Sequence, residues 1–360
     1  MACSVTAVAE PRAADAPVVT RYTGDATEWD AFVRATPGGT FFHLLGWKEV
    51  LEDTFGFTAH YLEARRGAAL AGVLPLFELH APFMERRLLS LPFAVEAGVC
   101  TADPDAQRAL DAAALALAAE RGACSVELRD ERDVAGFRLR EGRYYRFRRV
   151  LHADDADNLA AVPPKRRYMI RKGTRHGLTA QVDPADLAVF HDLYARTARH
   201  FGTPVFPRRF LRALLERFPD ETALLTVRLG STPVAGTLAF LYGDTVSPYY
   251  AGSRREFFRY AINDYMYWEL MRYASARGAR QFDFGRSKLG TGVFAFKQLW
   301  GFEPQQLRYR VAALDGGAPL ERSSGDRRLA QLQRAWRHLP LPVTKLLGPY
   351  FVARYGAYYT

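Results

Sequence analysis

Apolar runs separated by turn signals in the second half of the chain predict strands arranged around one long helix. The segments ALLTVRLG and PVAGTLAFLYG are apolar and β-branched, and the short Gly-Ser-Thr spacer between them predicts a hairpin. A third strand, TVSPYYAGS, follows Gly243. Residues 261–276 place apolar side chains at helical spacing and end before Gly278, which predicts a long helix. We expect FDFG as the next strand, GVFAFKQLWGF as a short helix and LRYRVAAL as the last strand.

The first half repeats this order of elements more faintly. AHYLEARRG and ALAGVLPLFEL are typical of the hairpin, and RRLLSLPFAVEAGV of the third strand. An alanine-rich helix is predicted over residues 107–121 and a strand at CSVELRD, and VAGFRLREG with YYRFRRVL completes the order. Two similar units in tandem are therefore expected.

Strands and helices in this order predict an α/β (α+β) fold of two domains, each a mixed and mostly antiparallel sheet with flanking helices. A chain of 360 residues also exceeds the usual size of a single core. We predict a flexible N-terminus at 1–19, a first domain at 20–155, a second domain at 156–325 and a basic, aromatic tail at 326–360. The first boundary falls where polar residues and a Pro-Pro pair interrupt the pattern.

Charge and cysteine content narrow the partners and the compartment. The net charge of +10 favours anionic partners such as nucleic acid, nucleotide-linked precursors or an acidic membrane surface. Three cysteines without paired spacing support neither a disulfide framework nor a zinc site, and the histidines show no metal spacing. No apolar run approaches the ~18 residues of a membrane helix, and the N-terminus does not read as a secretory signal. We expect a cytoplasmic protein.

A glycine-rich turn after FDFG carries two cations, Arg286 and Lys288. A strand end, flexible backbone amides and positive charge are typical of an anion cradle, which predicts a phosphate-bearing substrate. An ordinary turn with solvated cations is the alternative. Asp283, at the strand end, would orient a cation or accept a proton from an attacking amine, unless it caps the turn.

Six cations crowd into eleven residues at the start of the second half. They are Lys165, Arg166, Arg167, Arg171, Lys172 and Arg175. A solvated helix face is the common reading of such a cluster, but crowding like charges favours a bound anion, so we predict polyphosphate or acceptor-stem binding. Arginine offers the bidentate fork for phosphate, which makes Arg166 and Arg171 the preferred contacts.

Several longer segments resemble the Fem family of nonribosomal peptidyltransferases. They are PPKRRYMIRKGTRHGL, YYAGS, AINDYMYWELMRYASARG and FDFGRSKLGTGVFAFKQLWGF. With TPVFPRRF and SLPF they are similar to the FemAB-related branch associated with PEP-CTERM/exosortase systems. The order of elements resembles the GNAT-type acyl-CoA N-acyltransferase fold, although the junction AGSRREFFRYAIN lacks the glycine-rich CoA loop of that fold.

This resemblance implies transfer of an aminoacyl group from aminoacyl-tRNA to an amine on a nucleotide- or lipid-linked envelope or exopolysaccharide precursor. It places Lys297 near the transferred group, where it would stabilise the oxyanion or the terminal ribose; an exposed helix lysine is the alternative. Phe296 precedes it in the Phe-Lys pair. Tyr250 would line a cleft unless it is core, and Asn263 would bind substrate unless Asn263 or Asp264 caps the long helix.

We therefore predict an amide-forming acyltransferase without a covalent nucleophile, a metal or a bound cofactor. Its co-substrate would be aminoacyl-tRNA, held at the acceptor end, or acyl-CoA. The alternatives are an acyl-CoA-dependent N-acyltransferase acting on an amino sugar and a non-catalytic binder of RNA or anionic glycan. DNA is not an expected partner. The C-terminal tail would either fold back on the domain or lie on the inner face of the membrane.

Overall fold

A single sheet of 12 strands runs through the molecule, in the order β1-β2-β3-β4-β5-β12-β6-β11-β10-β9-β8-β7. The computed structural model describes residues 16–132, 134–314 and 327–358. The first half contributes β1 (Val18–Arg21), α1 (Ala26–Ala35), α2 (Leu45–Phe55), β2 (Thr58–Arg66), β3 (Ala69–Leu79), β4 (Arg87–Leu89), α3 (Pro104–Glu120), β5 (Ser125–Leu128) and β6 (Arg138–Val150).

The second half begins with two helices and then repeats the order of the first. Its elements are α4 (Asp155–Ala161), α5 (Pro164–Arg175), β7 (Leu178–Val182), α6 (Leu187–Phe201), α7 (Arg208–Arg217), β8 (Thr222–Leu229), β9 (Thr232–Tyr242), β10 (Thr245–Ser253), α8 (Ile262–Ser275), β11 (Gln281–Lys288), α9 (Gly292–Leu299) and β12 (Pro304–Ala313). Two C-terminal helices follow, α10 (Arg327–His338) and α11 (Leu341–Tyr355).

The predicted internal repeat is confirmed by the sheet. In each half a hairpin leads to a third strand, a long helix (α3 or α8) and a strand parallel to the third one, β4 with β5 and β10 with β11. All other strand pairs are antiparallel, as predicted. The described residues form no helix between β5 and β6, so α9 has no counterpart in the first half.

The last strands of the two halves are exchanged at the centre of the sheet. β6 follows β5 in the chain but pairs with β11, whereas β12 follows β11 but pairs with β5. β6 and β12 also pair with each other, which makes the sheet continuous. The predicted boundary near residue 155 stays a prediction, and the exchange is a feature that the repeat pattern did not indicate.

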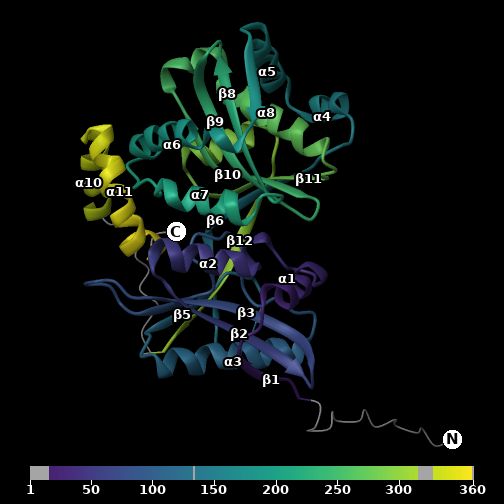
Figure 1. The fold of residues 1–360 in the computed structure, drawn as a ribbon, viewed down its shortest axis with the longest axis vertical. Helices are drawn as coiled ribbons and strands as arrows, with labels where there is room; N and C mark the ends of the chain where they lie inside the picture. The colour runs from purple at the N-terminus through teal and green to yellow at the C-terminus, as the bar shows by residue number, and fades with distance from the viewer. Residues whose placement is uncertain (1–15, 133, 315–326, 359–360) are drawn as a thin grey trace, which may run out of the picture.

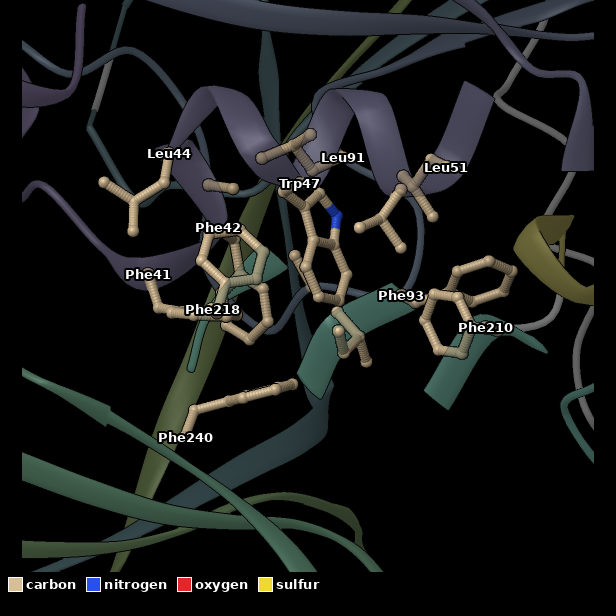
Figure 2. Close-up of a cluster of buried hydrophobic side chains, with 14 of the residues drawn as sticks. Phe41, Phe42, Leu44, Trp47, Leu51, Leu91, Phe93, Phe210, Phe218 and Phe240 are labelled. Carbon is tan, nitrogen blue, oxygen red and sulfur yellow. The ribbon is translucent and has the colours of Figure 1, made fainter. Parts of the chain in front are cut away.

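An aromatic cluster joins the two halves on one face of the sheet. Phe41, Phe42 and Trp47, from the segment around α2, meet Phe240 of β9, with the Phe41 and Phe240 ring centroids 4.2 Å apart. Figure 2 shows these rings between the α2 helix and the strand that carries Phe240, with Phe210 and Phe93 at the other end of the cluster. Burial of large rings from both halves in one core holds the halves together.

The predicted third strand of the first half is mostly not a strand. β4 covers only Arg87–Leu89, and the chain then bends through Pro92 and Phe93, which has a φ of 65°. Proline donates no ladder hydrogen bond and a positive φ interrupts an extended chain, so pairing stops there. Isolated bridges from Val73 to Cys100 and from Ala97 to Arg129 tie the remaining segment to the sheet.

The C-terminal tail folds back on the second half, one of the two predicted arrangements. α10 and α11 lie beside α6 at the edge of the molecule (Figure 1, yellow). Lys345 Nζ bonds the Asp192 carboxylate of α6 at 2.6 Å. Most of the predicted flexible N-terminus lies outside the described residues, and β1 begins within it at Val18.

Candidate active site

A bulge in β11 stands where the sequence predicts a glycine-rich turn. The strand does not end at Phe284 but continues to Lys288, with its pairing to β6 shifted between Asp283 and Arg286. Gly285 has a φ of 67° there, a conformation that glycine adopts without strain. Its N–H bonds Asp283 Oδ1 at 2.8 Å. The predicted anion-binding turn is therefore a bulge, which turns backbone carbonyl groups toward α9.

Lys297 reaches from α9 into this bulge. Its ammonium donates to the carbonyl oxygens of Phe284 (2.6 Å), Gly285 (3.1 Å) and Arg286 (3.2 Å), and only 6% of the residue is exposed. Burial lowers the Lys297 pKa to about 7, opposed by the Asp283 carboxylate and reinforced by Arg286. The alternative of an exposed helix lysine is thereby excluded. The side chain holds a titratable charge at the edge of a cavity.

Asp283 is a structural anchor of the same bulge. Its Oδ2 accepts from Arg146 Nε at 2.7 Å and from Arg148 Nε at 3.0 Å, and the residue is buried. It does not line the cavity described below. The bond from the Gly285 N–H agrees with the alternative of a turn cap, and the two arginine contacts agree with a role in orienting cations. Direct acceptance of a proton from a substrate has no geometric support.

A cavity of about 840 Å³ opens between the two halves next to Lys297. Phe93 and Val95 of the first half line it together with α6, β10, α8, β11, α9 and Arg337 of α10. Five of the predicted site residues are among those that line it, namely Tyr250, Asn263, Arg286, Phe296 and Lys297. The fold thus brings together residues 47 positions apart in sequence.

Tyr250 supplies a polar group in an otherwise aromatic wall. The residue is 6% exposed, and within the described part of the chain its hydroxyl has no hydrogen-bond partner. Burial raises its pKa well above the usual range, so the hydroxyl stays protonated. The neighbouring Tyr249 hydroxyl, by contrast, donates to the Phe93 carbonyl oxygen and ties the wall to the first half. The Tyr250 ring packs in the aromatic core against Phe206, Phe210 and Phe240 and its hydroxyl is buried, so the alternative of a core residue holds as well.

Asn263, in the first turn of α8, lines the cavity and does not cap the helix. The N-cap position is Ala261, with a φ of 61° and no side-chain cap bond, so the capping alternative for Asn263 and Asp264 is wrong. Asp264 instead accepts from Arg166 Nη1 at 2.9 Å. Asn263 is left half-buried with its amide beside the cavity.

The mouth of the cavity is strongly cationic. Its arginines are Arg196, Arg199, Arg254, Arg255, Arg286 and Arg337. The acid among the lining residues is Glu256, which bonds Arg254 Nε at 3.1 Å. Arg286 rests 4.5 Å from the ring centroid of Tyr144 and donates to the Tyr309 hydroxyl at 3.1 Å. A cavity edged by this excess of positive charge attracts polyanions.

The α5 cluster lies apart from this cavity. Arg166 is buried against α8 in its ion pair with Asp264, on the stripe of α5 that packs inward with Ile170 and Gly173. Its burial does not favour phosphate binding, which stays a prediction. Arg167, Arg171 and Lys172 do not line the cavity, nor does Lys288, which pairs with Tyr144 at the end of β11. Phosphate binding by these four residues stays a prediction.

Sequence reasoning named Arg286 but missed the other five arginines that line the cavity. Arg254 and Arg255 stand in the junction AGSRREFF, where the sequence lacks a glycine-rich loop. A signal for these two arginines was present in the sequence, because they occupy the junction where a GNAT-type fold would carry its glycine-rich CoA loop. Arg196, Arg199 and Arg337 carried no such signal, since the packing of α6 on β10 and of α10 on α6 brings them to the cavity.

The fold and site define a tandem GNAT-like protein. Residues 164–298 match the family described as "Acetyltransferase (GNAT) domain". The chain resembles a crystal structure of FemX with a TM-score of 0.68, at 17% identity over 82% of this chain and 98% of that one. It also resembles the C-terminal domain of a putative lysylphosphatidylglycerol synthetase from Agrobacterium fabrum, with a TM-score of 0.53 at 12% identity over 90% and 95% of the two chains. These findings confirm the predicted fold, and residues 164–298 are similar to an acetyltransferase domain.

A closer relative in sequence is the lipid II:glycine glycyltransferase of Staphylococcus haemolyticus (strain JCSC1435). It is 29% identical over 94 residues, which cover 24% of this chain and 22% of that protein. The similarity to Fem-type proteins is therefore confirmed at low identity, and the match spans about a fifth of the relative's length. The association with PEP-CTERM/exosortase systems stays a prediction.

Two features of the described residues bear on other classes of site. No helix among them is both long and apolar enough to span a bilayer. They also contain no group of three or more His, Cys, Asp or Glu residues placed to hold a metal ion.

Proposed function

We propose that this chain is an amide-forming acyltransferase that moves an aminoacyl group from aminoacyl-tRNA to an amine of a cell-envelope precursor. The observation that carries the proposal is the cavity in which the Lys297-held bulge faces a mouth edged by six arginines. The local similarity to a lipid II:glycine glycyltransferase supports the same reaction class. We place the reaction in the cytoplasm, at or near the inner face of the membrane.

The reaction needs no covalent enzyme intermediate. The acceptor nitrogen attacks the ester carbonyl carbon of the aminoacyl group, and a C–N bond forms as the carbonyl oxygen becomes an oxyanion. The tetrahedral intermediate then collapses, the C–O bond to the ribose breaks, and the proton lost by the amine ends on the ribose oxygen. The acceptor amine must be neutral to attack, and at physiological pH the neutral fraction is largest for an α-amine, whose pKa is near 8. Positioning and oxyanion stabilisation are then the main requirements.

The chain's own residues fit those requirements in distinct ways. Lys297 places a positive charge at the cavity wall, and its three carbonyl contacts fix the bulge that shapes this wall. Asp283 is a positioning residue, because its contacts hold Gly285, Arg146 and Arg148.

The two candidate functions differ in the donor substrate, which is aminoacyl-tRNA in one and acyl-CoA in the other. An acyl-CoA-dependent N-acyltransferase acting on an amino sugar is favoured by the match to a GNAT acetyltransferase domain. Against it, the junction after β10 forms a short helical turn, residues 255–260, in place of a glycine-rich loop. The adjacent Arg254 and Arg255, at the start of that turn, line the cavity mouth. Such a pair suits the phosphate backbone of a tRNA acceptor end, which is longer than the phosphate groups of CoA. A phosphate-bearing acceptor, nucleotide- or lipid-linked, would use the remaining arginines.

Charge reversal at the mouth should weaken donor binding. We expect Arg254→Glu with Arg255→Glu to raise the Kd for aminoacyl-tRNA at least tenfold and to flatten its salt dependence by about two phosphate contacts. Arg255 is exposed and Arg254 is half-buried, and neither belongs to the hydrophobic core, so the fold should persist. Filter binding between 50 and 300 mM NaCl measures both quantities.

The matched control reverses the same amount of charge on α5. Arg171→Glu with Arg175→Glu alters two exposed cations away from the cavity, and we expect less than a threefold change. Equal losses in the two variants would indicate nonspecific attraction by net charge. A larger loss in the α5 variant would move the phosphate site to α5 and contradict the proposed mouth.

A further inference from the structure

The C-terminal helix α11 is anchored through small and polar side chains. Thr344, Gly348 and Val352, spaced four residues apart, form its buried stripe. Gly348 sits so close to the segment at Val205 that an added Cβ would lie 2.9 Å from its atoms. Lys345 adds the bond to Asp192 of α6. The helix is therefore firmly seated, and its orientation is fixed without Leu346 and Leu347.

The outward face of α11 is apolar, the reverse of an ordinary surface helix. Leu346 is 78% exposed and Tyr350 54%, with Leu347 and Phe351 exposed beside them. Leu332 of α10 is exposed as well. A surface helix normally turns such residues to the core and its polar residues to water. A contiguous exposed apolar face of this kind marks an interaction surface.

A loop of the first half extends the same face. Tyr358 donates to the Glu85 carbonyl oxygen at 3.0 Å, and Pro82 lines one cavity together with Tyr350, so the loop between β3 and β4 lies against α11. At its tip Phe83 is fully exposed on a backbone with a φ of 62°. A non-glycine residue held in that conformation with its ring in water is an unusual feature that a binding role would explain.

The charge on the segment of α10 and α11 has one sign. Residues 327–360 contain no Asp or Glu, and they contain six Lys and Arg residues: Arg327, Arg328, Arg334, Arg337, Lys345 and Arg354. Exposed Leu and aromatic side chains among cations are the composition of helices that lie in the headgroup region of an anionic bilayer. We propose that α10, α11 and the Phe83 loop together form a surface that docks on an anionic membrane.

A second copy of this chain is a poorer occupant of the surface. In a two-fold symmetric dimer the same surface faces itself. This would bring together two copies of the segment 327–360, each with six cations and no acid. An anionic headgroup layer complements that charge. Arg337 also lines the cavity, so docking would set the cavity mouth next to the headgroups. This surface is independent of the proposed acyl transfer, and each can fail without the other.

The test is co-sedimentation of the purified full chain with vesicles. We expect binding to phosphatidylcholine vesicles that contain 30 mol% phosphatidylglycerol at 50 mM NaCl, and at least tenfold weaker binding to pure phosphatidylcholine. The variant Leu346→Ser, Leu347→Ser, Tyr350→Ser should bind the anionic vesicles at least tenfold more weakly. Val18→Ser, which alters an exposed apolar residue on the edge strand β1, is the control and should bind like the wild type.

Three results would overturn the proposal. They are no binding to the anionic vesicles at 50 mM NaCl, binding that the triple variant leaves unchanged, and a dimer in sedimentation velocity that the triple variant dissociates. The second would mean attraction by net charge alone, and the third would identify a second copy as the occupant. Unchanged circular dichroism and Tm for the variant confirm that the fold is intact, as expected for exposed side chains.

Discussion

Replacing Lys297 with methionine should lower kcat for acyl transfer at least tenfold while the protein stays folded. The substitution removes the positive charge at the cavity wall and frees the three carbonyl groups of the β11 bulge. Loss of one oxyanion-hole donor costs about 10²–10³ in kcat in known cases. The three N–H groups of Lys297 are already donated to carbonyl oxygens, so Lys297 would act through its charge, and we expect a loss nearer the tenfold limit. A change in kcat with little change in the KM of either substrate is the expected signature, because the charge acts on the transition state. Steady-state kinetics measure both parameters.

The pH profile separates this role from a purely structural one. Because the Lys297 pKa is lowered to about 7, the ammonium loses its proton as pH rises through that value. The ratio of wild-type to Lys297→Met kcat should therefore be largest below pH 7 and fall above it. Comparing the two enzymes cancels the ionisation of the acceptor amine. A kcat ratio that stays constant with pH would assign Lys297 to structure alone, and a ratio that rises with pH would make its neutral amine the active form. Lys165→Met is the control for the loss of an exposed lysine.

Replacing Arg310 with methionine should destabilise the protein by about 3–5 kcal/mol, the usual cost of leaving buried charges without their partner. Arg310 lies on the exchanged strand β12 and is fully buried. Its Nη1 bonds Asp111 Oδ1 of α3 at 2.8 Å, and its Nη2 bonds Asp130 Oδ2 at 2.7 Å. Without the guanidinium, the two carboxylates remain inside the first half. Urea unfolding measures the difference.

Arg308→Met is the matched control on the same strand. Arg308 is half-exposed and pairs with Glu141 at the surface, a kind of contact worth less than about 1 kcal/mol. A loss below 1 kcal/mol for Arg310→Met would contradict the view that this ion network locks β12 into the first half.

The sequence was sufficient for the elements that are encoded locally. Periodicity and turn residues predict the β8–β9 hairpin, α8 and α9, and the same signals reveal the repeat. Lys297 and Phe296 could be named because their segment resembles that of the Fem family, and Tyr250 because an amphipathic ring suits a cleft wall. The structure places these three and Asn263 at one cavity.

The rest depends on pairing between distant segments. Nothing local in β6 or β12 shows that the two strands change places, because both read as ordinary strands. The α5 cluster misled for a related reason. Charge density along a chain does not show which cation turns inward. Arg166 turns inward because it forms an ion pair with the buried Asp264 of α8. The cationic mouth likewise exists only after α6, the β10–α8 junction and α10 come together.

The most direct test of the central claim is a donor competition with the purified chain. Radiolabelled aminoacyl-tRNA is bound at low salt and then challenged separately with uncharged tRNA and with acyl-CoA. We predict displacement by tRNA, with the charged form binding more tightly than the uncharged form, and no displacement by acyl-CoA. Displacement by acyl-CoA, or no binding of aminoacyl-tRNA at 50 mM NaCl, would contradict the proposal and favour a CoA-dependent acyltransferase on the same fold.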